Sequence, residues 1–157
     1  MWNQLRVVIT GALFLCGMAA DEVAMYPKDF RDWANIKSAI ITKAHPAFAS
    51  EGGIHHIYAN PVAVAGYASG KFADGSVIVY ELVETNEKDA VITEGARRRV
   101  DVMVKDSNRY AATGGWGFLR FMGSNQTDEQ VGQGGKTKCF GCHARAEAHG
   151  FVFSTRR

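Results

Sequence analysis

The sequence predicts a single-domain α+β protein in which helices pack on a predominantly antiparallel β-sheet. Its 157 residues fit one domain, and its hydrophobic fraction of 46% is ordinary for a globular chain. Segments with strand-like alternation outnumber segments with helical spacing. The connections between the strand segments are short, which favours antiparallel pairing.

The first twenty residues have the layout of a secretory signal peptide. Arg6 provides an early positive charge, a mostly apolar run extends from Val7 to Met18, and small residues follow at Ala19 and Ala20. The run is shorter than the roughly 20 apolar residues of a membrane span, so an uncleaved membrane anchor is the weaker alternative. We therefore expect an exported, periplasmic protein whose folded domain comprises residues 21–157.

The first half of this domain predicts a helix, a strand and a second helix. Apolar residues of 26–40 recur near helical spacing, after a proline suited to a first turn. Residues 53–60 (GIHHIYAN) follow a loop and predict a strand. Residues 61–69 (PVAVAGYAS) predict the second helix, because Asn60 is a good capping residue and Gly70 a typical terminator.

The second half predicts three further strands, over residues 76–84, 96–106 and 116–123. The first follows an Asp-Gly turn, and glycines bound the third. In the second strand, three valines alternate with other residues, as on a strand with two different faces. A polar, Gly-rich loop over residues 124–138 then leads to a cysteine motif.

Cys139, Cys142 and His143 form a Cys-x-x-Cys-His motif, which is typical of c-type haem attachment. Each thiol would add to a haem vinyl group, and the histidine would bind the iron as proximal axial ligand. A zinc site completed by His149 and a thioredoxin-like dithiol stay open as alternatives. An adjacent cysteine and histidine suit tetrahedral zinc poorly, and a dithiol motif is expected nearer the N-terminus. Because Cys16 lies in the leader, the motif holds both cysteines of the exported chain, and one covalently attached haem c is favoured.

Six features, the cysteine motif included, occur in order between residues 26 and 154. They are Tyr26-Pro27, IYANP, GKFADGSVIVYELVE, VMVKDSNRYAATGGWGF, CFGCH and FVF. Together they resemble the cytochrome P-460 family, which includes cytochrome c′-beta. The resemblance implies a small periplasmic c-type cytochrome, mostly antiparallel sheet and usually a homodimer, with the haem held by the histidine of the motif. It also implies that small molecules bind on the opposite, distal side of the haem.

Within this resemblance, Tyr80 occupies the position that decides the chemistry. Hydroxylamine-oxidising members carry there a lysine whose nitrogen is cross-linked to the haem, and this chain has a tyrosine. Members without the lysine resemble five-coordinate haem proteins with apolar distal pockets that bind nitric oxide or carbon monoxide. We therefore expect a protein that binds such gases, with an oxidoreductase acting on hydroxylamine or related nitrogen compounds as the alternative.

The surroundings of Tyr80 in the sequence allow three interpretations. Its strand places it on an apolar face with Ile78 and Leu82, as expected for a core tyrosine with a paired hydroxyl. Alternatively, it lies over the iron and donates a hydrogen bond to a bound ligand. In the third interpretation it binds ferric iron as tyrosinate.

Asp101, Phe48 and Phe72 are the other distal candidates. Asp101 matches a family position that carries an acid near the haem, where it would accept protons. It shares its strand face with Arg99 and Lys105, which also fits a solvated surface residue. Phe48 and Phe72 would cap the distal face or belong to the ordinary core.

A sixth protein ligand to the iron would instead make the protein an electron carrier. The methionine candidates are Met103 and Met122, and the histidine candidates are His45, His55, His56 and His149. Expected partners are a gas ligand at the iron, a redox partner protein and a second copy of the chain. The formal charge of +2, with no basic run beyond residues 97–99, argues against nucleic acid.

Overall fold

The computed structural model describes residues 26–156, apart from the side chains of residues 133–135. The predicted leader of residues 1–20, with Cys16, lies outside the described residues. Within the described part, no helix is long and apolar enough to cross a membrane.

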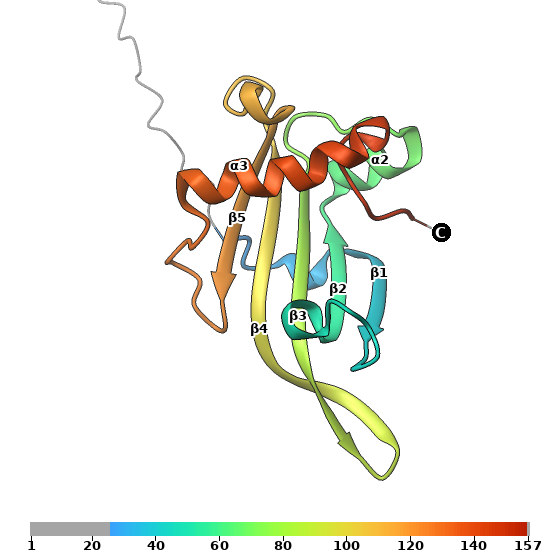
Figure 1. Cartoon of the computed structure of the whole chain (residues 1–157). Helices are drawn as coiled ribbons and strands as arrows, with labels where there is room; N and C mark the ends of the chain where they lie inside the picture. The colour runs from blue at the N-terminus through green and yellow to red at the C-terminus, as the bar shows by residue number, and fades with distance from the viewer. Residues whose placement is uncertain (1–25, 157) are drawn as a thin grey trace, which may run out of the picture.

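The chain folds around one antiparallel sheet with the strand order β1-β2-β3-β4-β5 (Figure 1). Each strand pairs with its neighbour in the sequence, which confirms the predicted α+β class. The strands are β1 (Ala34–Ile41), β2 (Gly53–Ala59), β3 (Val77–Lys88), β4 (Val91–Lys105) and β5 (Trp116–Met122). The helices are α1 (Phe48–Glu51), α2 (Pro61–Ser69) and α3 (Gly132–His143), with 3-10 segments η1 (Phe30–Asp32), η2 (Ala111–Thr113) and η3 (Ala144–His149).

The helix predicted over residues 26–40 is wrong. Only η1 turns helically, and the chain then extends as β1, in which Ile36 is buried. The β-branched residues Ile36, Ile40 and Ile41 suit a strand. Pairing of β1 with β2 supplies the backbone hydrogen bonds, and this long-range contact overrides the helical spacing.

The second predicted helix and the strand before it are confirmed as α2 and β2. Asn60 Oδ1 accepts hydrogen bonds from the backbone N–H groups of Ala63 at 2.9 Å and Val77 at 3.0 Å. Its Nδ2 donates to the carbonyl of Gly75 at 2.9 Å. Gly70 ends the helix with a φ of 73°, which a glycine adopts without strain. The cap of α2 therefore also fixes the helix against the start of β3.

β3 and β4 continue past their predicted ends and form a two-stranded arm beyond the rest of the sheet (Figure 1). Asp89 and Ala90 make its turn, with φ values of 52° and 61°. The arm lacks the apolar alternation of a half-buried strand, so the sequence did not predict that the two strands extend to its tip. Cross-strand pairing carries the two strands onward to Lys88 and Val91.

The loop predicted over residues 124–138 is wrong in its second part, because α3 begins at Gly132 and contains the cysteine motif. Cys139 and Phe140 pack against an apolar cluster on the sheet. This burial stabilises a helix whose glycines have low helical propensity. The buried members of the cluster are Ile36, Ala59, Ala63, Ile78, Trp116, Phe118 and Val152.

The opposite face of the sheet carries a second apolar cluster. Val100 and Val102 belong to it, whereas Asp101 and Met103 between and after them line a cavity on the α3 side, which Val102 also borders. The two-faced alternation predicted for this strand is therefore confirmed. The buried members of this cluster are Tyr26, Phe30, Val79, Val100, Val102, Leu119 and Phe121.

Candidate haem site

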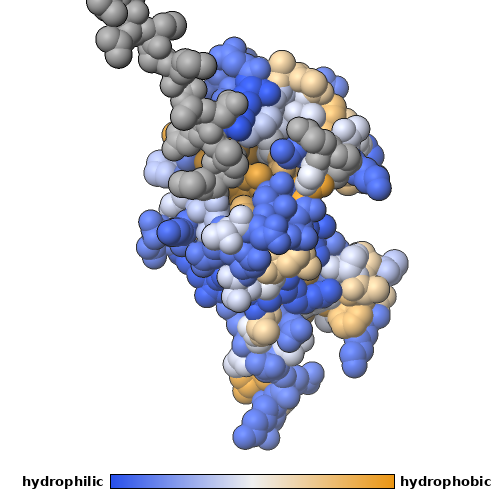
Figure 2. All heavy atoms as spheres, turned by 90° about the vertical axis from the view of Figure 1, so that its left-hand side faces the viewer, coloured by the Kyte–Doolittle hydropathy of each residue, from blue (hydrophilic) through white to orange (hydrophobic). Residues whose placement is uncertain are grey.

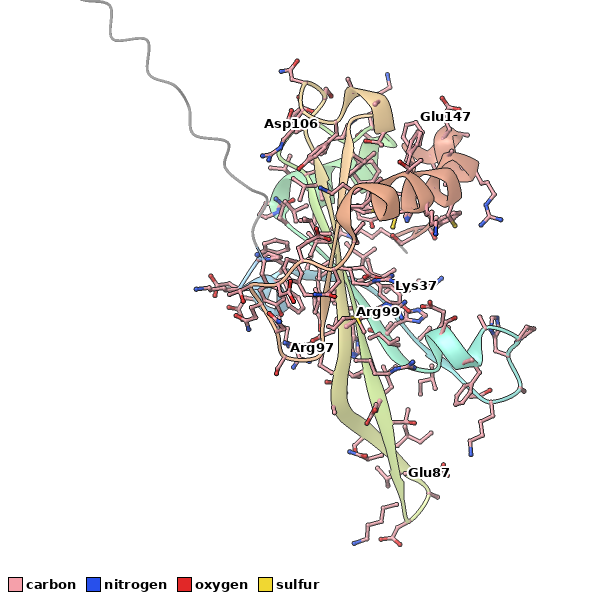
Figure 3. The ribbon with its side chains drawn as sticks, turned by 60° about the vertical axis from the view of Figure 1, so that its left-hand side comes forward. Lys37, Glu87, Arg97, Arg99, Asp106 and Glu147 are labelled. Atoms are coloured by element: carbon pink, nitrogen blue, oxygen red, sulfur yellow. The ribbon has the colours of Figure 1, made fainter. Side chains whose placement is uncertain are left out.

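A cavity of about 480 Å³ lies between α3 and the sheet, within the size range of small-molecule and cofactor sites. α3 and α1 project from the same face of the sheet, and Arg99 lies between them (Figure 3). Apolar atoms are visible beside hydrophilic ones in the middle of this face of the molecule (Figure 2). Half of the lining residues are apolar: Ile57, Ile78, Val102, Met103, Phe118, Leu119, Val131, Val152 and Phe153. The others are Glu51, Tyr80, Arg99, Asp101, Arg120, Ser154 and the three residues of the cysteine motif.

His143 lines this cavity with a defined orientation. Its Nδ1 lies 2.8 Å from the carbonyl oxygen of Phe151, which can only accept, so Nδ1 carries the proton. The ring packs between Phe118 and Phe153, with centroids 5.1 and 5.0 Å away. Burial lowers the pKa of His143, which favours the neutral imidazole. Nε2 is thus left with a free lone pair, the form in which histidine binds a metal.

The two cysteines of the motif are free thiols beside the same cavity. Cys139 is half-buried and Cys142 is exposed, with Arg145 Nη2 3.0 Å from the Cys142 Sγ. Burial raises the pKa of the Cys139 thiol. Among residues 26–156, no group of three or more His, Cys, Asp or Glu side chains is arranged as a metal site, the zinc set with His149 included.

Tyr80 and Asp101 meet on the wall of the cavity because the strand register aligns them. Ile57, Tyr80, Asp101 and Arg120 lie directly opposite one another on β2, β3, β4 and β5. Residues paired in this way point to the same face of a sheet. Two residues selected from the sequence by family position are therefore brought together in the structure.

These side chains form a continuous polar network along the wall. The Tyr80 hydroxyl donates to Glu51 Oε2 at 2.9 Å, and Arg99 Nη2 donates to the same oxygen at 2.6 Å. Arg99 Nε also donates to Asp101 Oδ2 at 3.0 Å, and Arg120 Nη2 donates to that oxygen at 2.7 Å. Asp101 is therefore paired with two arginines rather than simply solvated, and the wall is not the apolar one that the resemblance implies.

Tyr80 keeps its proton in this environment. Burial, and then the hydrogen bond to Glu51, raise the pKa of Tyr80 far above its ordinary value. The hydroxyl is paired, as the core interpretation predicts, while the side chain also lines the cavity. The tyrosinate interpretation is the least compatible with a raised pKa.

Phe48 and Phe72, predicted as candidate distal caps, do not line the cavity. Phe72 packs edge-on against Tyr67 and Trp116, with ring centroids 5.1 and 5.6 Å away, and so joins α2 to β5. Phe48 lies in α1 against Gly52. The aromatic residues that contact His143 are instead Phe118 and Phe153, which the sequence alone did not single out.

Of the candidate sixth ligands, Met103 alone lines the cavity. It packs with Cys139 and Phe140 against the cluster below α3, on the side that carries the motif. Met122 is 49% exposed, and His56 pairs with Glu94 and Ser38. His55 stacks on Tyr80 with a centroid distance of 5.2 Å. His45 and His149 are exposed.

Sequence reasoning missed three residues of the polar wall. Strand alternation places Arg99 on the same face as Asp101, and this pattern could have predicted that Arg99 belongs to the site. Arg120 could be found only by knowing the register of β4 with β5. Glu51 gave no local signal, because it reaches the site from the separate helix α1.

An antiparallel sheet with a Cys-x-x-Cys-His helix over a partly apolar cavity is typical of a protein of the c-type haem class. The family model described as Cytochrome P460 matches residues 27–154. The chain therefore belongs to the Cytochrome P460 family, and membership implies a haem c cofactor. The neutral His143 with its free Nε2, beside two thiols and a partly apolar lining, fits this group. A comparison with curated proteins gave no match.

Proposed function

We propose that this protein is a periplasmic c-type cytochrome with one haem, attached through Cys139 and Cys142, and an open position for nitric oxide or carbon monoxide. His143 would hold the iron on its proximal side. One observation carries the proposal. Apart from His143, the described residues that line the cavity include no histidine, and their one methionine, Met103, lies on the motif side.

The residues of the chain have separate tasks in this proposal. The haem supplies an iron that binds diatomic ligands. The Phe151 carbonyl fixes the ring of His143, and Phe118 and Phe153 flank that ring. The hydrogen bond from Tyr80 to Glu51 would keep the phenol protonated and so disfavour Tyr80 as a ligand of the iron.

The optical spectrum of the purified ferrous protein tests the open position. We expect a five-coordinate, high-spin spectrum that changes with saturation on adding carbon monoxide or nitric oxide, since the described cavity lining offers no second histidine and its one methionine lies on the motif side. A low-spin, six-coordinate spectrum without gas would contradict the proposal. In that case the Met103→Leu variant provides the control, because loss of the low-spin spectrum would identify an electron-transfer site with methionine ligation.

A second candidate function is oxidation of hydroxylamine or a related small nitrogen compound. It is favoured by the carboxylates Glu51 and Asp101 on the cavity wall, because breaking N–H and O–H bonds releases protons that a carboxylate accepts. A redox partner protein would take the electrons. Sustained hydroxylamine turnover with an artificial electron acceptor, lost in Asp101→Asn, would support this function over gas binding.

We also propose that two copies of the chain associate. The support comes from the arm of β3 and β4, whose apolar residues Val91 and Ile92 are 58% and 45% exposed. An isolated two-stranded hairpin is only marginally stable in water, so contact with a second copy would stabilise the arm. Sedimentation of the purified protein is expected to give the mass of a dimer. Replacing both residues by serine should shift the equilibrium toward monomer, and a monomeric mass for the unaltered protein at every concentration would contradict the proposal.

A further inference from the structure

Glu51 reaches the cavity because β4 holds the single turn of α1. Arg98 Nη2 donates to the carbonyl of Ala49 at 3.3 Å, and Arg99 Nη1 donates to the carbonyl of Ser50 at 2.9 Å. Arg98 Nη1 also donates to the carbonyl of Gly52. Cations at the carbonyl end of a helical turn are favourable, and these bonds satisfy carbonyls that lack partners within the turn. The position of Glu51 is therefore set by two arginines of the sheet.

Tyr80 is equally constrained. Its ring lies between His55, at a centroid distance of 5.2 Å, and the Arg99 guanidinium, 5.4 Å from the ring centroid. Its hydroxyl and Arg99 both donate to the same oxygen of Glu51. A phenol has one proton to donate, so with that proton committed the Tyr80 oxygen offers the cavity only lone pairs.

We infer that Glu51 is a positioning residue that turns the Tyr80 proton away from a ligand bound in the cavity, so that the pair discriminates against anionic ligands. A bound anion is stabilised by hydrogen-bond donors and destabilised by an oxygen that offers only lone pairs. Carbon monoxide is neutral and needs no donor. This inference rests on the proposed function, because it requires the ligand position to be open on the Tyr80 side.

The test compares azide binding to the ferric protein with carbon monoxide binding to the ferrous protein, both by optical titration of the haem-loaded full chain. The quantity measured is the ratio of the two affinities. In Glu51→Leu the Tyr80 hydroxyl becomes free to donate, and the ratio is expected to shift toward azide about tenfold, as for one hydrogen bond to a charged group. In the Tyr80→Phe background, the same substitution at Glu51 should give no such shift.

The double-variant comparison separates the hydrogen bond from the loss of a charge. A shift toward azide that persists in the Tyr80→Phe background would overturn the inference, because it would come from the missing carboxylate alone. Glu51→Gln keeps an oxygen that can accept from Tyr80 and is expected to restore most of the original ratio. Glu87→Gln removes the same charge at the tip of the arm, far from Arg99 (Figure 3), and controls for net charge.

Two further outcomes keep the inference and the proposed function distinguishable. If carbon monoxide binds but the azide ratio of Glu51→Leu equals that of the unaltered protein, the inference fails and the open site stands. If carbon monoxide does not bind the ferrous protein, the open site fails, and the inference fails with it. Glu51→Ala repeats the test with a smaller side chain, should leucine disturb α1.

Discussion

Replacing Cys139 and Cys142 together by serine is expected to abolish covalent attachment of the haem. Attachment needs the sulfur of each cysteine, and a serine hydroxyl is a far weaker nucleophile than a thiolate. Both thiols border the cavity that His143 lines. After denaturation and extraction with acidified organic solvent, haem should stay with the unaltered chain and leave the double variant, with less than about a tenth retained.

The control is His143→Ala, which removes the iron ligand and leaves both thiols in place. It should retain haem on the denatured chain while its optical spectrum changes, since the histidine supplies the axial nitrogen. Haem that remains bound to the denatured double variant would show that the attachment is made elsewhere. The expression host must have the machinery for c-type haem maturation, so that the unaltered chain is loaded.

The second large effect is expected at Glu81, on the face of the sheet opposite the cavity. Its side chain is completely buried. It accepts hydrogen bonds from Arg31 Nε and Nη2, both at 3.0 Å, and from Arg97 Nε at 2.6 Å. Removing one partner of a buried ion pair leaves the charges of the remaining partners unpaired. Glu81→Ala should lower the free energy of unfolding by about 3 kcal/mol, measured by urea denaturation.

A matched variant on the same strand shows how much of the loss in stability comes from burial of the carboxylate and how much from removal of its charge. Glu87 is exposed on the arm, so Glu87→Ala should change the free energy of unfolding by less than about 0.5 kcal/mol. The side chains of Arg31 and Arg97 are 49% and 23% exposed, so water can partly solvate them after Glu81 is removed. The expected loss of unfolding free energy therefore lies at the lower end of the range for a broken buried ion pair. A loss at Glu81 as small as that at Glu87 would contradict a stabilising role for this cluster.

Several features were predictable because their signals are local. The Cys-x-x-Cys-His spacing, the Asn60–Pro61 start of α2 and the alternation around Asp101 each depend on residues a few positions apart. Short connections between strand segments predicted the antiparallel order, which the five paired strands confirm. The family position drew attention to Tyr80, and the structure brings it to the same wall as Asp101.

Other features depended on partners distant in the sequence. β1 has helical spacing but forms a strand, because β2 offers it backbone hydrogen bonds and a buried position for Ile36. α3 is helical despite its glycines, because Cys139 and Phe140 pack on the sheet.

By itself, the sequence determined that this chain carries a Cys-x-x-Cys-His motif and predicted a largely antiparallel sheet, and the family resemblance singled out Tyr80. Only the tertiary structure decided which side chains surround the cavity. It brought Glu51 from α1, Arg99 from β4 and Arg120 from β5 into one network, and left Phe48 and Phe72 outside. The physical reason is that hydrogen bonding and burial at a site depend on strand register and on packing between distant segments, neither of which is written in local spacing.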